Sequence, residues 1–110
     1  MDGERDELAD RVRALLGVAP GIEERRMFGT RAFLIDGHIL VGARRGGALL
    51  VRVAEENGAT LVLRPGVSQA LMGSKTMGLG WLDVDASALR DDDDLVFWLD
   101  VAREDAGGES

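Results

Sequence analysis

The sequence predicts a two-layer α+β domain, in which an antiparallel five-stranded sheet carries helices mainly on one face. Near both ends of the 110-residue chain, apolar residues recur at the spacing of amphipathic helices. Between these segments, short apolar runs are separated by turns rich in glycine, which is typical of antiparallel strands. A sheet of this kind needs a helical cover on one face, and that arrangement defines the two-layer class.

The first helix is expected over residues 4–16, with Asp2 as its N-cap. Acidic residues in the first turn favour this start because they lie near the positive end of the helix dipole. Gly17 can end the helix, and Pro20-Gly21 turns the chain. The apolar stripe consists of Leu8, Val12, Leu15 and Leu16.

Three strands are expected next, forming an antiparallel meander. Asp36-Gly37 predicts a two-residue hairpin turn, because a type I′ turn needs positive φ at both central positions. A second turn is expected at Arg45-Gly46-Gly47, before a segment that alternates as a half-buried strand does. The expected strands cover residues 26–35, 38–43 and 48–53.

Residues 54–64 fit two structures. Asn57-Gly58 followed by apolar residues fits a second hairpin, whereas a short helix that ends before Pro65 fits as well. In the helix, Gly58 would cost up to about 1 kcal/mol relative to alanine. Two more strands are expected at residues 67–72 and 78–84, separated by a turn at residues 73–75.

The last helix is expected over residues 92–104, with Asp91 as its N-cap and aspartates in its first turn. Its apolar stripe consists of Leu95, Trp98, Leu99 and Ala102. The length predicts one domain, residues 1–106, and the glycine-rich residues 107–110 are expected to form a flexible tail.

The composition, with 45% apolar and 30% charged residues, is that of a folded domain. The absence of cysteine excludes disulfides, thiolate metal sites and cysteine nucleophiles, and it fits a reducing compartment. No apolar run has the length of a membrane span, and the N-terminus does not resemble a signal peptide. We therefore expect a cytoplasmic protein with no membrane partner.

The formal net charge of −7 disfavours direct nucleic-acid binding, which depends on neutralising phosphates. The charge is uneven, however, because acidic residues crowd both ends of the chain and arginines gather in the middle. A local basic face is one interpretation, and scattered arginines in ordinary ion pairs are the simpler one. The central arginines are Arg25, Arg26, Arg31, Arg44, Arg45 and Arg52.

Catalytic, metal and cofactor motifs are incomplete. His38 is the single histidine, and none of Ser68, Ser74 and Ser87 lies in a Gly-x-Ser-x-Gly elbow. The aspartates at positions 83, 85 and 91–94 lack the spacing of a calcium loop, and helix capping explains the last four. Gly73-Ser74-Lys75-Thr76 lacks the earlier glycine of a phosphate loop. We expect no catalytic residue, metal or cofactor.

Several side chains suit an interface. Arginine and aromatic residues are enriched at interface hot spots, which draws attention to Arg25, Arg26 and Phe28. Phe28 fits the beginning of a core strand better than an interface. Trp81 alternates with Leu82 and Val84, so it points away from the core if they point into it. Burial of Trp81 under a loop fits equally well.

Four segments in this order resemble the N-terminal domain of the TfoX/Sxy family, bacterial regulators of competence for DNA transformation. They are residues 25–37, reading R-R-M-F-G-T-R-A-F-L-I-D-G, the strand at residues 47–53, the Lys-Thr-Met-Gly step at residues 75–78, and the closing helix at residues 89–102. With the opening helix, the resemblance covers residues 8–104. It implies a fold like that of secretion chaperones, with a helix at residues 55–63 and the order α-β-β-β-α-β-β-α. Asn57-Gly58 departs from the stronger helix formers of relatives, and the second domain of long members is absent from this sequence.

The resemblance implies a non-enzymatic role in gene regulation or competence through a protein partner such as a transcription regulator. Monomer and homodimer both stay open. Direct nucleic-acid binding through the arginines is the main alternative, and a small hydrolase or ligand-binding protein is the third. The residues expected to bind the partner are Arg25, Arg26, Phe28, Arg44, Arg45, Lys75 and Trp81.

Overall fold

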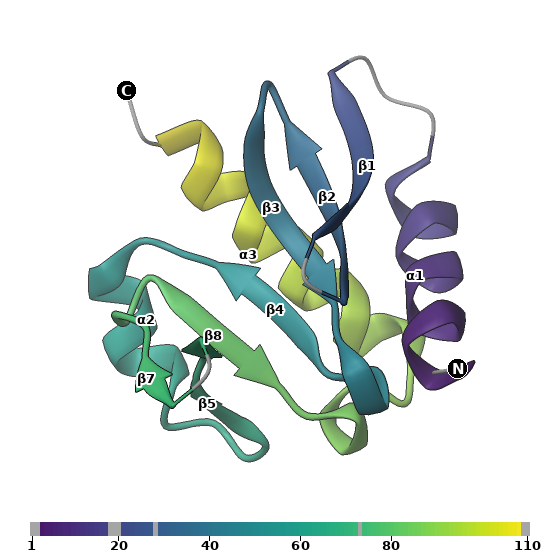
Figure 1. Cartoon of the computed structure of the whole chain (residues 1–110). Coiled ribbons are helices and arrows are strands. Elements are labelled where there is room, and N and C mark those ends of the chain that lie inside the picture. Colours follow the sequence, from purple (N-terminus) through teal and green to yellow (C-terminus); the bar gives the residue numbers. More distant parts are fainter. Residues whose placement is uncertain (1–2, 18–20, 28, 73, 109–110) are drawn as a thin grey trace.

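The computed structural model describes residues 3–17, 21–27, 29–72 and 74–108, and it confirms the two-layer α+β class. In Figure 1, helix α3 (Asp92–Gly108) passes behind the sheet, and helix α1 (Gly3–Leu16) lies to the right of the strands. The short helix α2 (Glu55–Leu61) packs its Leu61 against the same apolar core. Among the described residues, no helix has both the length and the apolar character that crossing a membrane requires.

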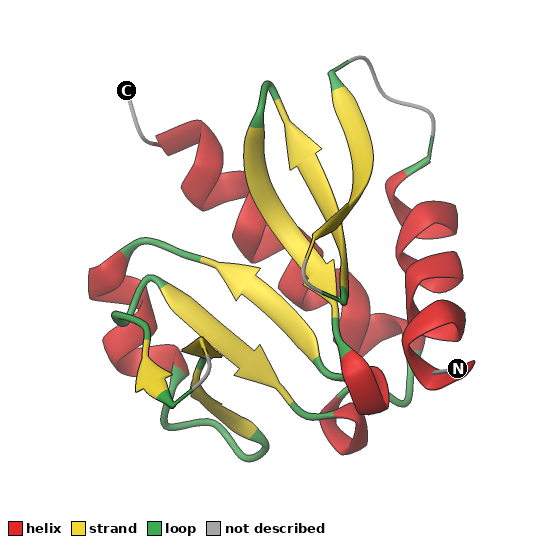
Figure 2. Cartoon of the chain, viewed as in Figure 1, coloured by secondary structure: helices red, strands yellow, loops and turns green. Residues whose placement is uncertain are grey.

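The main sheet has six antiparallel strands in the order β1-β2-β3-β4-β8-β5 (Figure 2). A separate two-stranded sheet joins β6 to β7. The strands of the main sheet are β1 (Ile22–Met27), β2 (Thr30–Ile35), β3 (His38–Ala43), β4 (Leu49–Arg52), β5 (Val67–Gln69) and β8 (Trp81–Val84). The other elements are β6 (Leu71–Met72), β7 (Lys75–Thr76) and the 3-10 turns η1 (Arg45–Gly47) and η2 (Ala86–Ala88).

The single strand expected at residues 26–35 is wrong, because this segment belongs to two strands. β1 and β2 pair in register from Ile22–Ile35 to Met27–Thr30, and Gly29 between them has a positive φ of 79°. The sequence pattern missed β1 because its four central residues are all charged and exposed. The turn at Asp36-Gly37 is confirmed, with φ values of 50° and 84°. Strands β1 to β4 therefore form a four-stranded meander.

The second pair of expected strands also needs correction. Residues 67–72 divide into β5, which pairs with β8, and β6, which pairs with β7. Lys75 lies in β7 and not in a turn, and β8 begins at Trp81 and not at residue 78. The fully buried Ala70 joins the two parts, since its N–H donates to the Trp81 carbonyl and its carbonyl accepts from the Met77 N–H.

The core lies between the sheet and helices α1 and α3. Alternate residues of the central strands point into it and are fully buried, among them Val51 and Leu82. The predicted apolar stripes of both helices pack there, with Leu15 only partly buried. The buried helix side chains are Leu8, Val12 and Leu16 of α1 and Leu95, Trp98, Leu99 and Ala102 of α3.

Residues 55–61 form a helix, as the family resemblance implies. Gly58 is buried against the turn before β8, where a Cβ atom would collide with the Leu79 carbonyl. The helix has no side-chain cap at Ala54. Asp105 of α3 anchors the start of this helix instead, because its carboxylate accepts from the Ala54 N–H and from the Asn57 side-chain amide, both at 2.9 Å. The unusual Asn57-Gly58 pair is thus explained by tertiary contacts.

The last helix begins as predicted and extends to Gly108. The Asp91 carbonyl accepts from the Leu95 N–H, which is the backbone arrangement of an N-cap residue. Residues 107 and 108, expected in the tail, thus lie within α3. The proposed N-cap Asp2 of the first helix lies outside the described residues.

Candidate functional site

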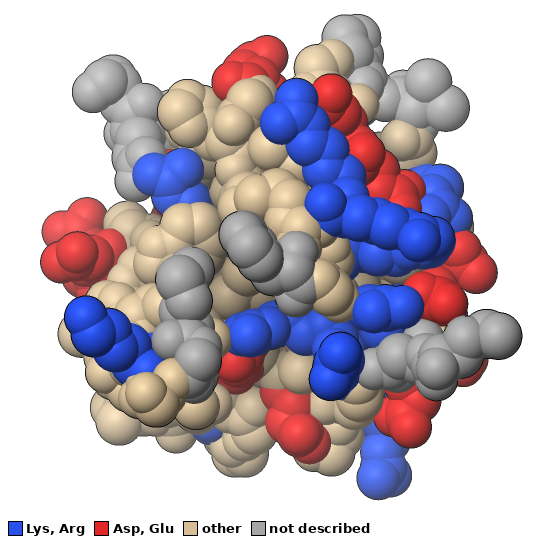
Figure 3. Space-filling view, viewed as in Figure 1, with Lys and Arg blue, Asp and Glu red and all other residues tan. Residues whose placement is uncertain are grey.

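The side of the main sheet opposite the helices is its outer face, the side nearer the viewer in Figure 1. Strand alternation places Leu50 and Arg52 of β4 on this face, because Leu49 and Val51 are fully buried on the other. In β8, Trp81 and Asp83 point outward for the same reason. Lys and Arg side chains gather here, as the blue regions of Figure 3 show. The outer face is the candidate site.

Trp81 forms the centre of one part of the outer face. It is half-buried and lies directly opposite Arg52 in the β4–β8 ladder. The Arg52 guanidinium carbon lies 5.8 Å from the centroid of the Trp81 ring, within the range of a cation–π contact. Arg52 was not among the residues expected to bind a partner. Only the pairing of β4 with β8 brings it to Trp81.

Arg44 acts as a structural clamp. Its Nη1 donates to both carboxylate oxygens of Asp83 at 3.0 Å, and its Nη2 donates to the Leu71 carbonyl at 3.1 Å. Both side chains of the ion pair are half-buried, at 30% and 24% exposure. The clamp joins the end of β3 to β8 and draws the β6–β7 hairpin toward the outer face. It leaves Arg44 little freedom to bind a partner.

An open hollow of about 270 Å³ lies beside this clamp. Arg45 and Thr30 both line it, and Arg45 is exposed. The Thr30 methyl group covers Gly42, where a Cβ atom would approach it to 2.7 Å. Lys75 is exposed on the β6–β7 hairpin that Arg44 holds. Arg45 and Lys75 are therefore two of the expected partner residues that are exposed on the outer face.

Arg25 and Arg26 do not form one patch. They are neighbours in β1, so their side chains point to opposite faces of the sheet. Arg25 points to the outer face and pairs with Glu23 at 3.1 Å, while Arg26 shares the helix side with its ladder partner Arg31. Phe28, also expected at the interface, lies outside the described residues.

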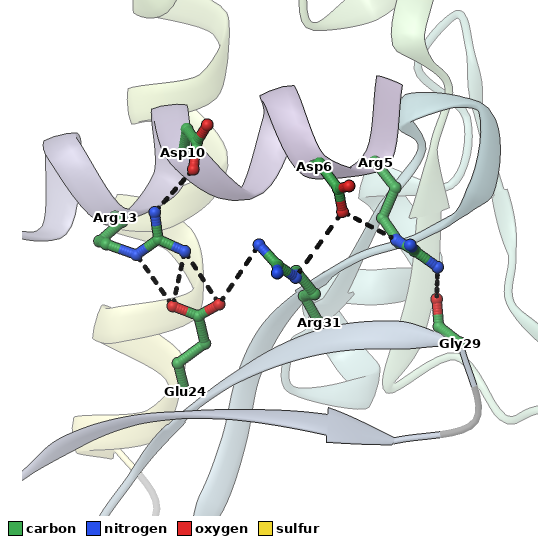
Figure 4. Close-up of polar contacts among 7 residues, drawn as sticks. All are labelled: Arg5, Asp6, Asp10, Arg13, Glu24, Gly29 and Arg31. Carbon is green, nitrogen blue, oxygen red and sulfur yellow. Dashed lines mark hydrogen bonds and ion pairs between the residues drawn. The ribbon is translucent and has the colours of Figure 1, made fainter. Parts of the chain in front are cut away.

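Three of the six central arginines, Arg25, Arg31 and Arg44, lie beside carboxylates. Figure 4 shows a chain of contacts between α1 and the β1–β2 hairpin, in which Arg31 lies 3.7 Å from Asp6 and 3.9 Å from Glu24. Arg13 donates to both Glu24 oxygens at 2.9 Å. The hydrogen bonds from Arg13 to Asp10 and Glu24 raise the pKa of its guanidinium above its ordinary value. Half of the central arginine cluster is thus compensated by neighbouring carboxylates.

The structure does not bring the candidate catalytic residues together around His38. That side chain is exposed in a hollow lined by Ile35, Asp36, Arg52 and Ala106. The Ser87 hydroxyl and backbone N–H both donate to Asp85, and these bonds lower the pKa of that carboxyl below 3.8. Within the described ranges, no three acidic or histidine side chains are grouped as metal ligands.

The family comparison agrees with the fold. The model of the TfoX N-terminal domain matches residues 14–106, which is most of the chain. Searches of curated proteins and of solved structures each gave no match. The matched segment contains every strand of the main sheet, the Arg44 clamp and the Asp105 anchor of α2. The chain therefore belongs to the TfoX N-terminal domain family.

Proposed function

We propose that this chain is a non-enzymatic regulatory domain that acts in transcription regulation by binding a protein partner through its outer face. Membership in the TfoX N-terminal domain family supports the regulatory class. The observation that carries the proposal is the uneven cover of the sheet. Helices α1 and α3 bury one face, while the opposite face keeps Trp81 half-exposed beside Arg52.

The chemistry of the outer face indicates what its partner offers. Arg45 and Lys75 supply exposed positive charge, and Leu71 between them in the chain is 47% exposed. An aromatic ring, an aliphatic side chain and cations together suit a protein surface that combines apolar side chains with carboxylates. The half-buried Arg44–Asp83 pair holds these elements in place.

Duplex nucleic acid is less well suited to this surface. Arg25 is paired with Glu23, Arg31 lies near Asp6 and Glu24, and Arg44 is paired with Asp83. Binding to phosphates would have to compete with these carboxylates, and the net charge of −7 opposes the approach of DNA. A protein partner avoids both costs.

The test compares charge reversals of equal size at two sites. Lys75→Glu and Arg45→Glu reverse charges on the outer face, while Arg90→Glu, beside α1 and Glu7, is the matched control. A partner recovered by crosslinking in the native cell is purified, and its affinity for each variant is measured by calorimetry. We expect roughly tenfold weaker binding for each outer-face variant and for Trp81→Ala, with little change for the control.

A reporter of partner-dependent transcription should fall in parallel with the affinity. Equal affinity of all variants for the purified partner would reject the outer face as the binding surface. Affinity of the isolated chain for duplex DNA, falling steeply with salt, would instead favour the nucleic-acid alternative. Thermal melting of each variant separates lost binding from lost folding.

A further inference from the structure

Strand β1 ends the main sheet with a free edge. In the described part of the chain, β2 is the one strand that pairs with it. Its four central residues, Glu23 to Arg26, are all exposed, and Ile22 and Met27 at its ends are half-buried. The unpaired N–H and C=O groups of such an edge are a template for another strand, and charged side chains decide which strand is accepted.

The direction of the free groups follows from the hairpin register. Ile22 lies opposite Ile35, and the preceding Gly21 carbonyl accepts from the Asp36 N–H at 3.2 Å. Because hydrogen-bonded and non-hydrogen-bonded pairs alternate in an antiparallel ladder, Glu23, Arg25 and Met27 direct their backbone groups to β2. The outward groups therefore belong to Ile22, Glu24 and Arg26.

We propose that a second copy of this chain pairs antiparallel with β1, about a two-fold axis that passes beside Glu24. Such an axis stands perpendicular to the sheet and keeps both helical layers on one side. Each residue must then lie opposite one whose side chain points to the same face. Centring the pairing on Glu24 meets this condition, with Ile22 of one copy opposite Arg26 of the other.

The charges of β1 are self-complementary in this register. Glu23 of one copy lies opposite Arg25 of the other on the outer face, and the symmetry repeats this pair. These positions are non-hydrogen-bonded pairs, where opposing side chains approach most closely. Within one copy, Glu23 and Arg25 already contact each other at 3.1 Å, so both side chains reach the same region.

The two Glu24 carboxylates that face each other across the axis are each neutralised by arginines of their own copy. Each carboxylate accepts two hydrogen bonds from Arg13 at 2.9 Å and lies 3.9 Å from Arg31. In the register centred on Arg25, that arginine would face its own copy, and like charges would be opposed on the outer face. The register centred on Glu24 places Glu23 opposite Arg25 there instead, and it is preferred for that reason.

The dimer does not depend on the proposed partner function. It uses the edge of the sheet, while the partner surface is its outer face. In the dimer the two outer faces would continue each other across the axis. Assembly can therefore be measured on the purified chain alone, with no partner present, and a failed partner test would leave the assembly result unaffected.

The test uses sedimentation velocity over a wide range of protein concentration. The purified chain should shift reversibly from the 11.8 kDa monomer to twice that mass. Glu23→Arg and Arg25→Glu each place like charges opposite each other, and each variant should dimerise roughly tenfold or more weakly. An equimolar mixture of these two variants should form a heterodimer, because every outer-face pair is then opposite in charge.

Arg90→Glu is the matched control, since it changes the same charge away from β1 and should dimerise as the unmodified chain does. Arg26→Pro removes an outward N–H without touching the bonds to β2, and it should also weaken the dimer. Thermal melts confirm that each variant folds. A chain that stays monomeric at its highest soluble concentration overturns the proposal. The proposal is also overturned if Glu23→Arg and Arg25→Glu dimerise as strongly as the unmodified chain. Failure of their equimolar mixture to form heterodimers overturns it as well.

Discussion

The two halves of the main sheet are held to their helices in different ways. Strands β4 and β8 present fully buried Leu49, Val51, Leu82 and Val84 to the core formed with α3. The hairpin β1–β2 also contributes Phe33 to the core, but it is tied to α1 by ion pairs in addition, as between Arg13 and Glu24. Apolar burial is little affected by salt, whereas ion pairs at the surface are screened by it. The attachment of the β1–β2 half therefore has a salt-dependent part that the attachment of β4 and β8 lacks.

The largest effect is expected from the apolar half. Trp98→Ala removes a ring that is 3% exposed and packs in the core, and large-to-small changes of this kind cost about 3–5 kcal/mol. Chemical denaturation should show the lower unfolding free energy. An unchanged midpoint would mean that α3 contributes little to the core, contrary to the comparison.

Gly58→Ala should cause the second-largest loss of stability. A methyl group there meets the Leu79 carbonyl, so α2 or the turn before β8 must shift, at a cost of about 1–3 kcal/mol. Gly46→Ala is a useful comparison, because no atom lies within 4 Å of a Cβ there and only its φ of 73° opposes the change. Denaturant midpoints measure both variants, and equal losses would contradict the close approach of the Leu79 carbonyl at Gly58.

Removal of the Arg44 clamp on the outer face should lower stability by less than either of these changes. Arg44→Ala leaves Asp83 half-buried without its guanidinium partner and frees the β6–β7 hairpin, for a loss of about 1–2 kcal/mol. Hydrogen exchange at Leu71 and Trp81 should quicken locally. Arg44→Lys tests the geometry, since a lysine cannot reproduce the forked contacts to Asp83 and Leu71. Unaltered exchange in both variants would argue against a clamp.

The ion-paired half gives a smaller effect that depends on salt. Glu24→Gln should lower stability by about 0.5 kcal/mol at low ionic strength, and the difference should vanish at high salt. Melting curves of both proteins at several salt concentrations measure this. A loss that persists at high salt would show that Glu24 acts by packing and not by charge.

The smallest effect concerns pH. Hydrogen bonds from Ser87 hold the folded-state pKa of Asp85 below 3.8, so the ionised form stabilises the fold. This contribution is complete above the unfolded-state pKa and is lost as the pH falls through the folded-state value. Ser87→Ala should therefore reduce stability at neutral pH and weaken its dependence on acid. Acid titration of both proteins, followed by circular dichroism, checks the sign.

Sequence patterns predicted those parts of the fold in which periodicity reports burial. The stripes of α1 and α3 and the Asp36-Gly37 turn follow from local spacing alone. Strand β1 was not predicted as a separate strand, because an exposed edge strand needs no apolar alternation. The helix at residues 55–61 was resolved by the family resemblance, since Gly58 and Asn57 are explained by contacts with distant residues.

The candidate site was less predictable for a topological reason. The alternation of β8 left Trp81 either on the outer face or buried under a loop, and the structure places it on the outer face. Its neighbour Arg52 is supplied by the pairing of β4 with β8. Arg44 was expected to bind a partner, yet it is engaged by Asp83, which lies 39 positions away in the chain. Such contacts depend on strand order, which spacing along the sequence does not report.

The hydrogen bonds from the start of α2 to Asp105 make the position of α2 depend on the last turns of α3. Truncation of α3 from its C-terminal end would leave these two hydrogen bonds intact until it removed Asp105. From that point α2 would lose its borrowed anchor, and the turn packed against Gly58 would loosen with it. Loss of Asp105 from α3 would thus disturb the turn that precedes Trp81, whose side chain lies on the outer face.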